Sequence, residues 1–107
     1  MSQPIEEIDV AGLERVLADG GVVVDVRNPD EFEEARVPGV VPIPLPEFAA
    51  RIGEVPPAEV VYVICRSGAR SLKACEVLIA AGRSAVNVAG GTLAWIDSGR
   101  PVEAGPT

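Results

Sequence analysis

The strongest constraint on the fold is a set of three short apolar runs, most of whose residues are β-branched. Val22–Val24 has no alternation of apolar and polar residues, which predicts a strand buried on both faces of a sheet. Val60–Ile64 and Ala85–Val88 are predicted as two further buried strands. Segments with helical patterns lie between these runs, and strands that alternate with helices form a parallel sheet covered on both faces. The sequence therefore predicts an α/β fold.

The segments between the strands carry signals of helices and turns. Asp9 and Asn28 are predicted to cap the first two helices, and Pro29 suits a first helical position. Four prolines within residues 37–46 exclude a helix there and leave only a short strand near Val40–Ile43. The predicted helices are Val10–Ala18, Pro29 to about Ala35, Glu47–Ile52, Arg70–Ala81 and Thr92–Ser98, with a weak strand at Ile5–Ile8 and a tail at Pro101–Thr107.

The size and charge of the chain limit the classes of function. A chain of 107 residues has room for one compact domain, residues 1–107, whose core we expect over about residues 4–100. The net charge of −7 is uneven, because residues 1–34 hold ten acids against two bases and residues 35–107 hold six acids against seven bases. An acidic protein is a poor partner for nucleic acid. We interpret the acidic first third as a solvated surface.

The two cysteines and the hydropathy pattern predict a cytoplasmic protein without a membrane partner. No apolar stretch approaches the roughly 18 residues of a membrane-spanning helix, and Met1–Pro4 lack the pattern of a signal peptide. With a helix between them, Cys65 and Cys75 would lie about 15 Å apart along its axis, too far for a disulfide. Unpaired cysteines suit a reducing compartment. Cys75 shares a helical face with Leu72, Leu78 and Ile79, so we expect it in the core.

Cys65 is the candidate for chemistry, because the sequence changes abruptly after it. A core cysteine would not be followed at once by Arg66, Ser67 and Gly68, which need solvent or an anion. A strand that delivers a cysteine to a short loop and then a helix directs backbone N–H groups and the positive end of the helix dipole at the sulfur. The chain contains no histidine, which excludes Cys-His catalytic pairs and histidine metal sites. Dipoles and arginines must therefore lower the pKa of the Cys65 thiol.

Asp25 and Arg27 stand at the end of another buried strand. Ligands of parallel sheets bind at the carboxyl ends of strands, so these residues are expected near Cys65. We favour a structural interpretation, a cap and an ion pair that tie the strand end to the next loop, although the carboxylate could also orient the Cys65 loop. Gly90–Gly91 and Trp95 are interpreted as a turn and a hydrophobic anchor.

Four motifs in order resemble the rhodanese (sulfurtransferase) family over nearly the whole chain. They are Val24-Asp25-Val26-Arg27 followed by Glu31-Phe32, Val37-Pro38-Gly39-Val40 with Ile43-Pro44-Leu45, the loop Cys65-Arg66-Ser67-Gly68-Ala69-Arg70-Ser71, and Gly90-Gly91 with Ala94-Trp95. The resemblance implies a single rhodanese-like domain with a five-stranded, mostly parallel sheet. It also departs from the family at one point, because Ala35 and Arg36 stand where the middle motif commonly has Gly-His.

The resemblance further implies sulfur transfer by a ping-pong reaction without a cofactor. The Cys65 thiolate would take a sulfane sulfur from a donor such as thiosulfate, and the persulfide would pass it to cyanide or to a thiol, free or on a protein. The loop from Arg66 to Ser71, which comprises Arg66, Ser67, Gly68, Ala69, Arg70 and Ser71, would bind the donor, and its two arginines would attract the oxyanion end. Asp25 and Arg27 would support the loop.

Two other functions are compatible with a reactive cysteine on such a fold. A cysteine phosphatase or arsenate reductase places five residues between cysteine and arginine, whereas four lie between Cys65 and Arg70. The shorter loop suits a single sulfur atom better than a tetrahedral anion. A persulfide carrier or partner-binding module without general turnover is the second alternative, and the sequence does not separate it from an enzyme.

Overall fold

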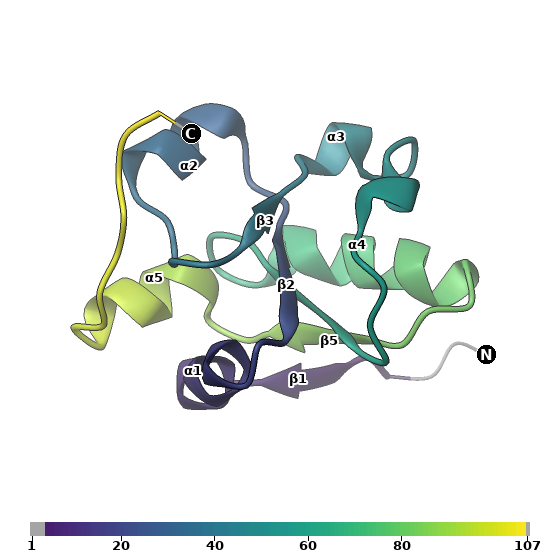
Figure 1. The fold of residues 1–107 in the computed structure, drawn as a ribbon, viewed down its shortest axis with the longest axis horizontal. Helices are drawn as coiled ribbons and strands as arrows, with labels where there is room; N and C mark the ends of the chain where they lie inside the picture. Colours follow the sequence, from purple (N-terminus) through teal and green to yellow (C-terminus); the bar gives the residue numbers. More distant parts are fainter. Residues whose placement is uncertain (1–3, 107) are drawn as a thin grey trace.

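The structure, a computed structural model, describes residues 4–106 and contains the predicted parallel sheet (Figure 1). Its strands are β1 (Glu6–Ile8), β2 (Val22–Asp25), β3 (Val41–Pro42), β4 (Val61–Ile64) and β5 (Ala85–Val88). They lie in the order β1-β5-β4-β2-β3, and all four pairings are parallel. The apolar runs form the three central strands, as the sequence predicts, because only central strands are covered on both faces.

The helices follow the predicted capping signals. They are α1 (Val10–Ala18), α2 (Pro29–Glu34), α3 (Leu45–Phe48), α4 (Ala69–Ala80) and α5 (Gly91–Asp97), with a 3₁₀ turn η1 at Ile52–Glu54. The Asp9 carboxylate accepts the Gly12 N–H at 2.9 Å and caps α1. The side chain of Glu31 accepts the Asn28 N–H at 3.1 Å and completes a capping box at the start of α2.

The prediction for the proline-rich segment was wrong in part. The prolines predict no helix through Pro46 and a helix at Glu47–Ile52, whereas α3 begins at Leu45 and includes Pro46. A proline in the first helical turn costs nothing, because its missing N–H would have no partner inside the helix. Residues 52–54 form the separate turn η1, so the expected helix is two short pieces.

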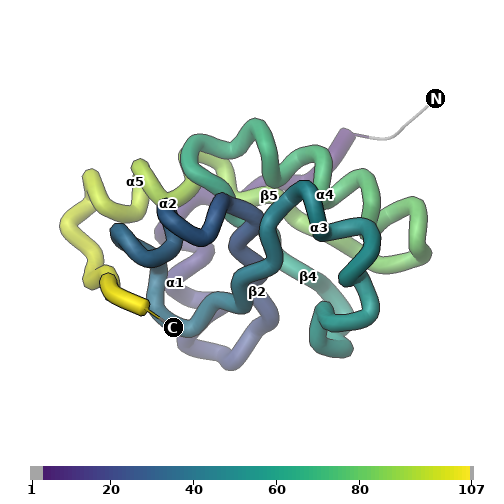
Figure 2. The backbone as a smooth tube through the Cα atoms, turned by 90° about the horizontal axis from the view of Figure 1, so that it is seen from above, coloured from purple at the N-terminus to yellow at the C-terminus, as the bar shows by residue number. Residues whose placement is uncertain are grey.

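Two apolar clusters cover the two faces of the sheet. The larger lies between the sheet and the side that carries α3 and α4, and it contains Phe48, Val63, Cys75 and Leu78. The smaller contains Leu13 of α1, Ile64 of β4 and Trp95 of α5. Figure 2 shows α3 and α4 on one side of the strands and α5 on the other. Among residues 4–106, no helix is long and apolar enough to cross a membrane.

Residues 101–106 lie outside both clusters but are fixed to the domain. They run from α5 up to α2 (Figure 1), and Arg36 and Glu103 pair as an antiparallel bridge with N···O distances of 2.8 and 2.9 Å. The Arg36 guanidinium donates to the carbonyls of Phe32 and Gly105 at 3.1 and 2.7 Å. Arg36, which stands where the resembled motif has histidine, thus joins the end of the chain to α2.

Candidate active site

The ends of β2 and β4 lie side by side at the carboxyl edge of the sheet. Asp25 is in register with Ile64, so Cys65 follows directly beyond the neighbouring strand end. The loop that starts at Cys65 reaches α4 within four residues, because Gly68 adopts φ = +111° and turns the chain into the helix. This left-handed conformation favours glycine. The predicted succession of strand, cysteine, short loop and helix is therefore present.

The sulfur of Cys65 faces the polar groups of this loop. It accepts hydrogen bonds from the Gly68 N–H at 3.1 Å and from the Ser71 hydroxyl at 3.2 Å. Burial raises the pKa of the Cys65 thiol, but the Ser71 hydroxyl and the N–H groups of Ser71, Gly68 and Ser67 outweigh it, so the pKa lies below the ordinary thiol value. We call these donors the sulfur cradle. They are hydrogen-bond donors that stabilise a thiolate without an imidazole.

The start of α5 holds the carbonyls of the loop away from the sulfur. The Cys65 carbonyl accepts from the N–H and the hydroxyl of Thr92 at 2.9 and 3.0 Å, and the Arg66 carbonyl accepts from the Leu93 N–H at 3.0 Å. Since C=O and N–H point in opposite directions across a trans peptide, fixing the Arg66 carbonyl on α5 turns the Ser67 N–H toward the sulfur. A Cβ at Gly91 would lie 2.5 Å from the Cys65 carbonyl oxygen, so only glycine permits this contact.

A buried amide from β5 supports the cradle from behind. The Asn87 side chain is fully buried, and its nitrogen donates to the Gly68 carbonyl at 3.1 Å and to the Glu7 carboxylate at 2.7 Å. The same Gly68 carbonyl lies 3.2 Å from the Ser71 hydroxyl oxygen, so it shares the single hydroxyl proton with the Cys65 sulfur. Asn87 thus fixes the residue where the loop becomes α4. Asn87 was not among the predicted site residues, and its only signal in the sequence is an amide within the apolar strand Ala85–Val88.

The expectation that Cys65 lies outside the core was wrong, because the residue belongs to the larger apolar cluster. Cys65 is only 1% exposed, although Arg66 and Ser67 beside it are exposed. The polar residues after Cys65 therefore reach solvent, while the sulfur lies beneath them inside the cradle. A reactant that contacts this sulfur must present a small terminal atom.

The two arginines of the loop differ in their partners. Both terminal nitrogens of Arg70 donate to the Glu31 carboxylate of α2, at 2.7 and 2.9 Å, in a bidentate ion pair. This contact lowers the pKa of Glu31 to about 2, against the opposing effect of burial. Arg66 is exposed and forms no ion pair with any residue in the 4–106 range. The expected pair of anion-binding arginines is thus one free guanidinium and one that Glu31 occupies.

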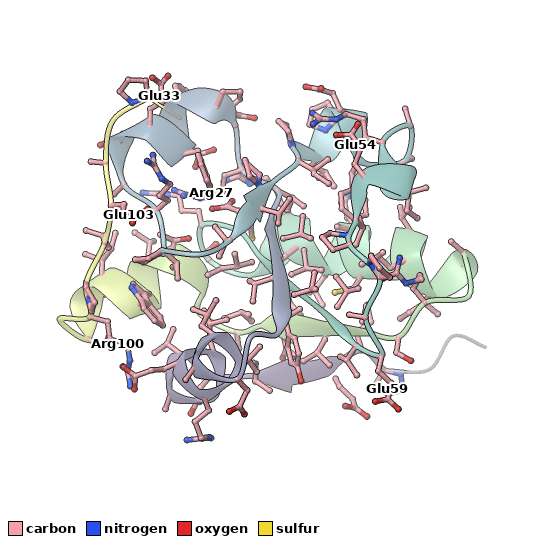
Figure 3. All side chains as sticks on the ribbon, viewed as in Figure 1. Arg27, Glu33, Glu54, Glu59, Arg100 and Glu103 are labelled. Atoms are coloured by element: carbon pink, nitrogen blue, oxygen red, sulfur yellow. The ribbon has the colours of Figure 1, made fainter. Side chains whose placement is uncertain are left out.

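Asp25 and Arg27 form a closed structural unit rather than part of the cradle. Their side chains meet at 2.8 Å, and Asp25 also accepts the backbone N–H of Arg27 at 2.9 Å. Arg27 donates further to the carbonyls of Glu31 and Ala35 at 3.3 and 2.8 Å. Figure 3 shows Arg27 beneath α2. The pair therefore holds α2 over the strand ends, and α2 in turn presents Glu31 to Arg70.

The second cysteine has the properties of a core residue. Cys75 is fully buried in the larger apolar cluster, and burial, with smaller effects of Glu7, Cys65 and Glu76, raises its pKa to about 12. Both cysteines are free. Within the described part of the chain, no three Cys, Asp or Glu side chains gather closely enough to hold a metal ion.

Comparison with known proteins agrees with the fold. The family model of the rhodanese-like domain matches residues 9–98. A sulfurtransferase of Allochromatium vinosum is 37% identical over 94% of this chain and 96% of its own length. Thiosulfate sulfurtransferase 18 of Arabidopsis thaliana is 34% identical over 94% of this chain and 85% of its own length.

Solved structures give the same result. A rhodanese-related protein of Thermoplasma volcanium superposes with a TM-score of 0.84 at 32% identity, covering 92% of this chain and 97% of its own. Its extent matches that of the present domain, so the likeness concerns the whole fold rather than a shared sheet. The parallel sheet, the cysteine loop at its carboxyl edge and these matches place the chain in the rhodanese-like domain family.

Proposed function

We propose that this domain is a sulfurtransferase that carries a sulfane sulfur on Cys65 as a persulfide. The observation that carries the proposal is the sulfur cradle, in which Gly68 and Ser71 donate to Cys65 Sγ at 3.1 and 3.2 Å. Their effect, with that of the Ser67 and Ser71 N–H groups, is a pKa below the ordinary thiol value. The names of the sulfurtransferase relatives from Allochromatium vinosum and Arabidopsis thaliana support the same reaction.

The first half-reaction loads the sulfur. The Cys65 thiolate attacks the outer sulfur of thiosulfate, a new S–S bond forms, and the donor's S–S bond breaks as sulfite leaves with the electron pair. Arg66 is the cation available for the sulfonate oxygens, because Arg70 donates both terminal nitrogens to Glu31. The narrow access to Cys65 favours donors whose sulfur is terminal, which thiosulfate and persulfides share.

The second half-reaction returns the thiolate. Cyanide or an acceptor thiolate attacks the outer sulfur of the persulfide, and Cys65 leaves with the electron pair of the S–S bond. Thiocyanate or an acceptor persulfide is the product, and no external oxidant or reductant enters. The cradle donors serve both steps, because they stabilise negative charge on the attacking sulfur and on the leaving sulfur.

The alternatives are weaker on this geometry. A phosphatase uses the loop arginine to bind the phosphoryl oxygens, whereas Arg70 is turned to Glu31 in a bidentate pair. The loop also keeps four residues between Cys65 and Arg70. A persulfide carrier would use the same cradle and differs only in turnover, so it is separated from an enzyme by kinetics.

Intact mass measured after incubation with thiosulfate, and again after addition of cyanide, tests the proposal. We expect a gain of one sulfur atom that cyanide removes. The variant Cys65→Ser should lose the gain, whereas Cys75→Ser, which removes the buried second thiol, should keep it. A gain that persists in Cys65→Ser would contradict the site. Hydrolysis of an aryl phosphate faster than sulfur transfer would favour the phosphatase, and loading with a single turnover only would favour the carrier.

A further inference from the structure

A small groove lies between α2 and α5, and it adjoins the Cys65 loop at Arg66. Its volume is about 220 Å³, and Glu31 and Glu34 of α2 line one wall, Leu93 and Ile96 of α5 the other, with Arg66 at the loop. The Leu93 N–H donates to the Arg66 carbonyl at 3.0 Å, so the groove begins at the residue that follows Cys65. Figure 1 shows α2 above α5 at the left end of the molecule.

The α5 wall of the groove is apolar and open to solvent. Leu93 is 39% exposed and Ile96 is 41% exposed, and the pair is spaced three residues apart on one helix face. Only two other large apolar side chains of residues 4–106, Ile79 and Val102, reach such exposure, and neither lines the groove. Single exposed apolar residues are ordinary, whereas Leu93 and Ile96 both line one groove next to Arg66.

The charges along the groove give it a direction. Four charged residues line it, and two of them are neutralised, Arg27 by Asp25 and Glu31 by Arg70. Arg66 and Glu34 make no ion pair with any other residue between 4 and 106. Glu34 lies one helical turn beyond Glu31, about 5 Å along the axis of α2. The groove therefore offers a cation next to Cys65 and a carboxylate farther along the acidic helix.

We propose that this groove binds a short segment of a thiol-bearing protein acceptor, an inference that rests on the proposed sulfur transfer. The acceptor's cysteine lies at Arg66, an adjacent apolar side chain packs on Leu93 and Ile96, and a lysine or arginine next to that meets Glu34. Arg66 favours the thiolate form of the acceptor. That thiolate attacks the outer sulfur of the Cys65 persulfide, the Cys65 S–S bond breaks, and its electron pair stays on Cys65.

Peptide acceptors test this groove directly. Domain loaded with sulfur by thiosulfate is mixed with peptides that contain Cys-Leu-Arg, Arg-Leu-Cys, Cys-Ser-Arg, Cys-Leu-Glu or Cys-Ser-Glu, and the rate of peptide persulfide formation is followed by mass spectrometry. We expect one of the two Leu/Arg orders to exceed Cys-Ser-Glu at least tenfold in kcat/KM. The leucine should account for about tenfold, and the arginine for about two- to fivefold because its ion pair is exposed.

Matched variants locate the preference. Glu34→Gln should remove the advantage of arginine, and Ile96→Ala should reduce that of leucine, while transfer to cyanide is unchanged. Glu33→Gln and Ile79→Ala are the controls, since they remove an acid of the same helix and an equally exposed apolar side chain outside the groove. Equal rates for all peptides, or a preference that survives the groove variants, would overturn the inference. Failure to load sulfur at all would instead contradict the proposed function.

Discussion

The ends of the neighbouring strands β2 and β4 differ in how the hydrogen-bonding groups beside them are paired. At the end of β2, the Asp25 carboxylate accepts four hydrogen bonds from Arg27, and the remaining Arg27 contacts go to carbonyls of α2. At the end of β4, the carbonyls of the loop are bound by α5 and Asn87, and donors converge on the Cys65 sulfur. The first end is a closed ion pair, and the second is a set of donors around one atom.

The difference shows why a place at the carboxyl edge of a parallel sheet is not enough to make a residue reactive. Asp25 is in register with Ile64 on the adjacent strand, and Cys65 is the next residue after Ile64. Asp25 already has a full positive charge as its partner, so it gains nothing from a ligand. Cys65 has only neutral donors in direct contact, and these favour added negative charge on the sulfur.

The largest effect on stability is expected from breaking the ion pair at the end of β2. Asp25→Ala leaves the buried Arg27 guanidinium unpaired, and breaking a buried pair in this way costs about 3–5 kcal/mol in the free energy of unfolding. Urea unfolding measures this loss. In the folded fraction the pKa of the Cys65 thiol should be unchanged, because Asp25 does not contact the sulfur. A thiol pKa that moves strongly in Asp25→Ala would mean that the two strand ends act as one site.

The next largest effect is expected from removing one hydrogen-bond donor to the Cys65 sulfur. Ser71→Ala removes a hydrogen bond to the thiolate worth about 1.5–3 kcal/mol, which raises the thiol pKa by about one to two units. Because the thiolate is the reactive form, the midpoint of iodoacetamide alkylation should move to higher pH, and sulfur loading at neutral pH should slow accordingly. Ser84→Ala, an exposed serine before β5, is the matched control. An unmoved midpoint in Ser71→Ala would show that the N–H groups alone hold the thiolate.

A smaller effect on the thiol pKa is expected from Asn87, which contacts the Gly68 carbonyl and not the sulfur. Asn87→Ala removes the buried donor to the Gly68 carbonyl and should cost about 1–2 kcal/mol in the free energy of unfolding. The thiol pKa should rise by less than in Ser71→Ala, since Asn87 acts through Gly68. Thr92→Val is the comparison, because it removes a buried hydroxyl that binds the Cys65 carbonyl instead. If both variants shift the alkylation midpoint equally, the two contacts position the loop in the same way.

The local elements of the fold were predictable, because their signals are local. β-branched runs, the cap at Asp9 and the capping box at Asn28 depend on residues within a few positions of each other, and all are present. The error at Pro46 arose from treating proline as a helix breaker without regard to its place in the first turn.

The contacts that complete the candidate site were not predictable from local patterns. Glu31 meets Arg70 across 39 positions, and Asn87 meets Gly68 across 19. The acids of α2 fit a helix start on their own, so nothing local distinguishes Glu31 from its neighbours. The sequence therefore predicted Cys65 and its loop, while the partner that occupies Arg70 depends on how the sheet brings α2 to the loop.

The smallest effect is expected from Glu31→Gln, which removes the ion-pair partner of Arg70 and so leaves a second free guanidinium, besides that of Arg66, in the Cys65 loop. The Arg70 contact lowers the pKa of Glu31 from 4.5 to about 2, so the ion pair stabilises the fold above pH 4.5 and the contribution is lost as the pH falls toward 2. At neutral pH the loss should be at most about 1 kcal/mol, because both side chains are partly exposed. Glu31→Gln should therefore flatten the pH dependence of urea unfolding between pH 4.5 and 2.

The freed Arg70 should raise kcat/KM for the thiosulfate dianion about two- to fivefold, by the gain of one exposed charge contact. The same variant should leave kcat/KM for an uncharged persulfide donor unchanged. A fall in kcat/KM for thiosulfate would contradict this, because it would mean that Arg70 serves the site only when Glu31 holds it in place.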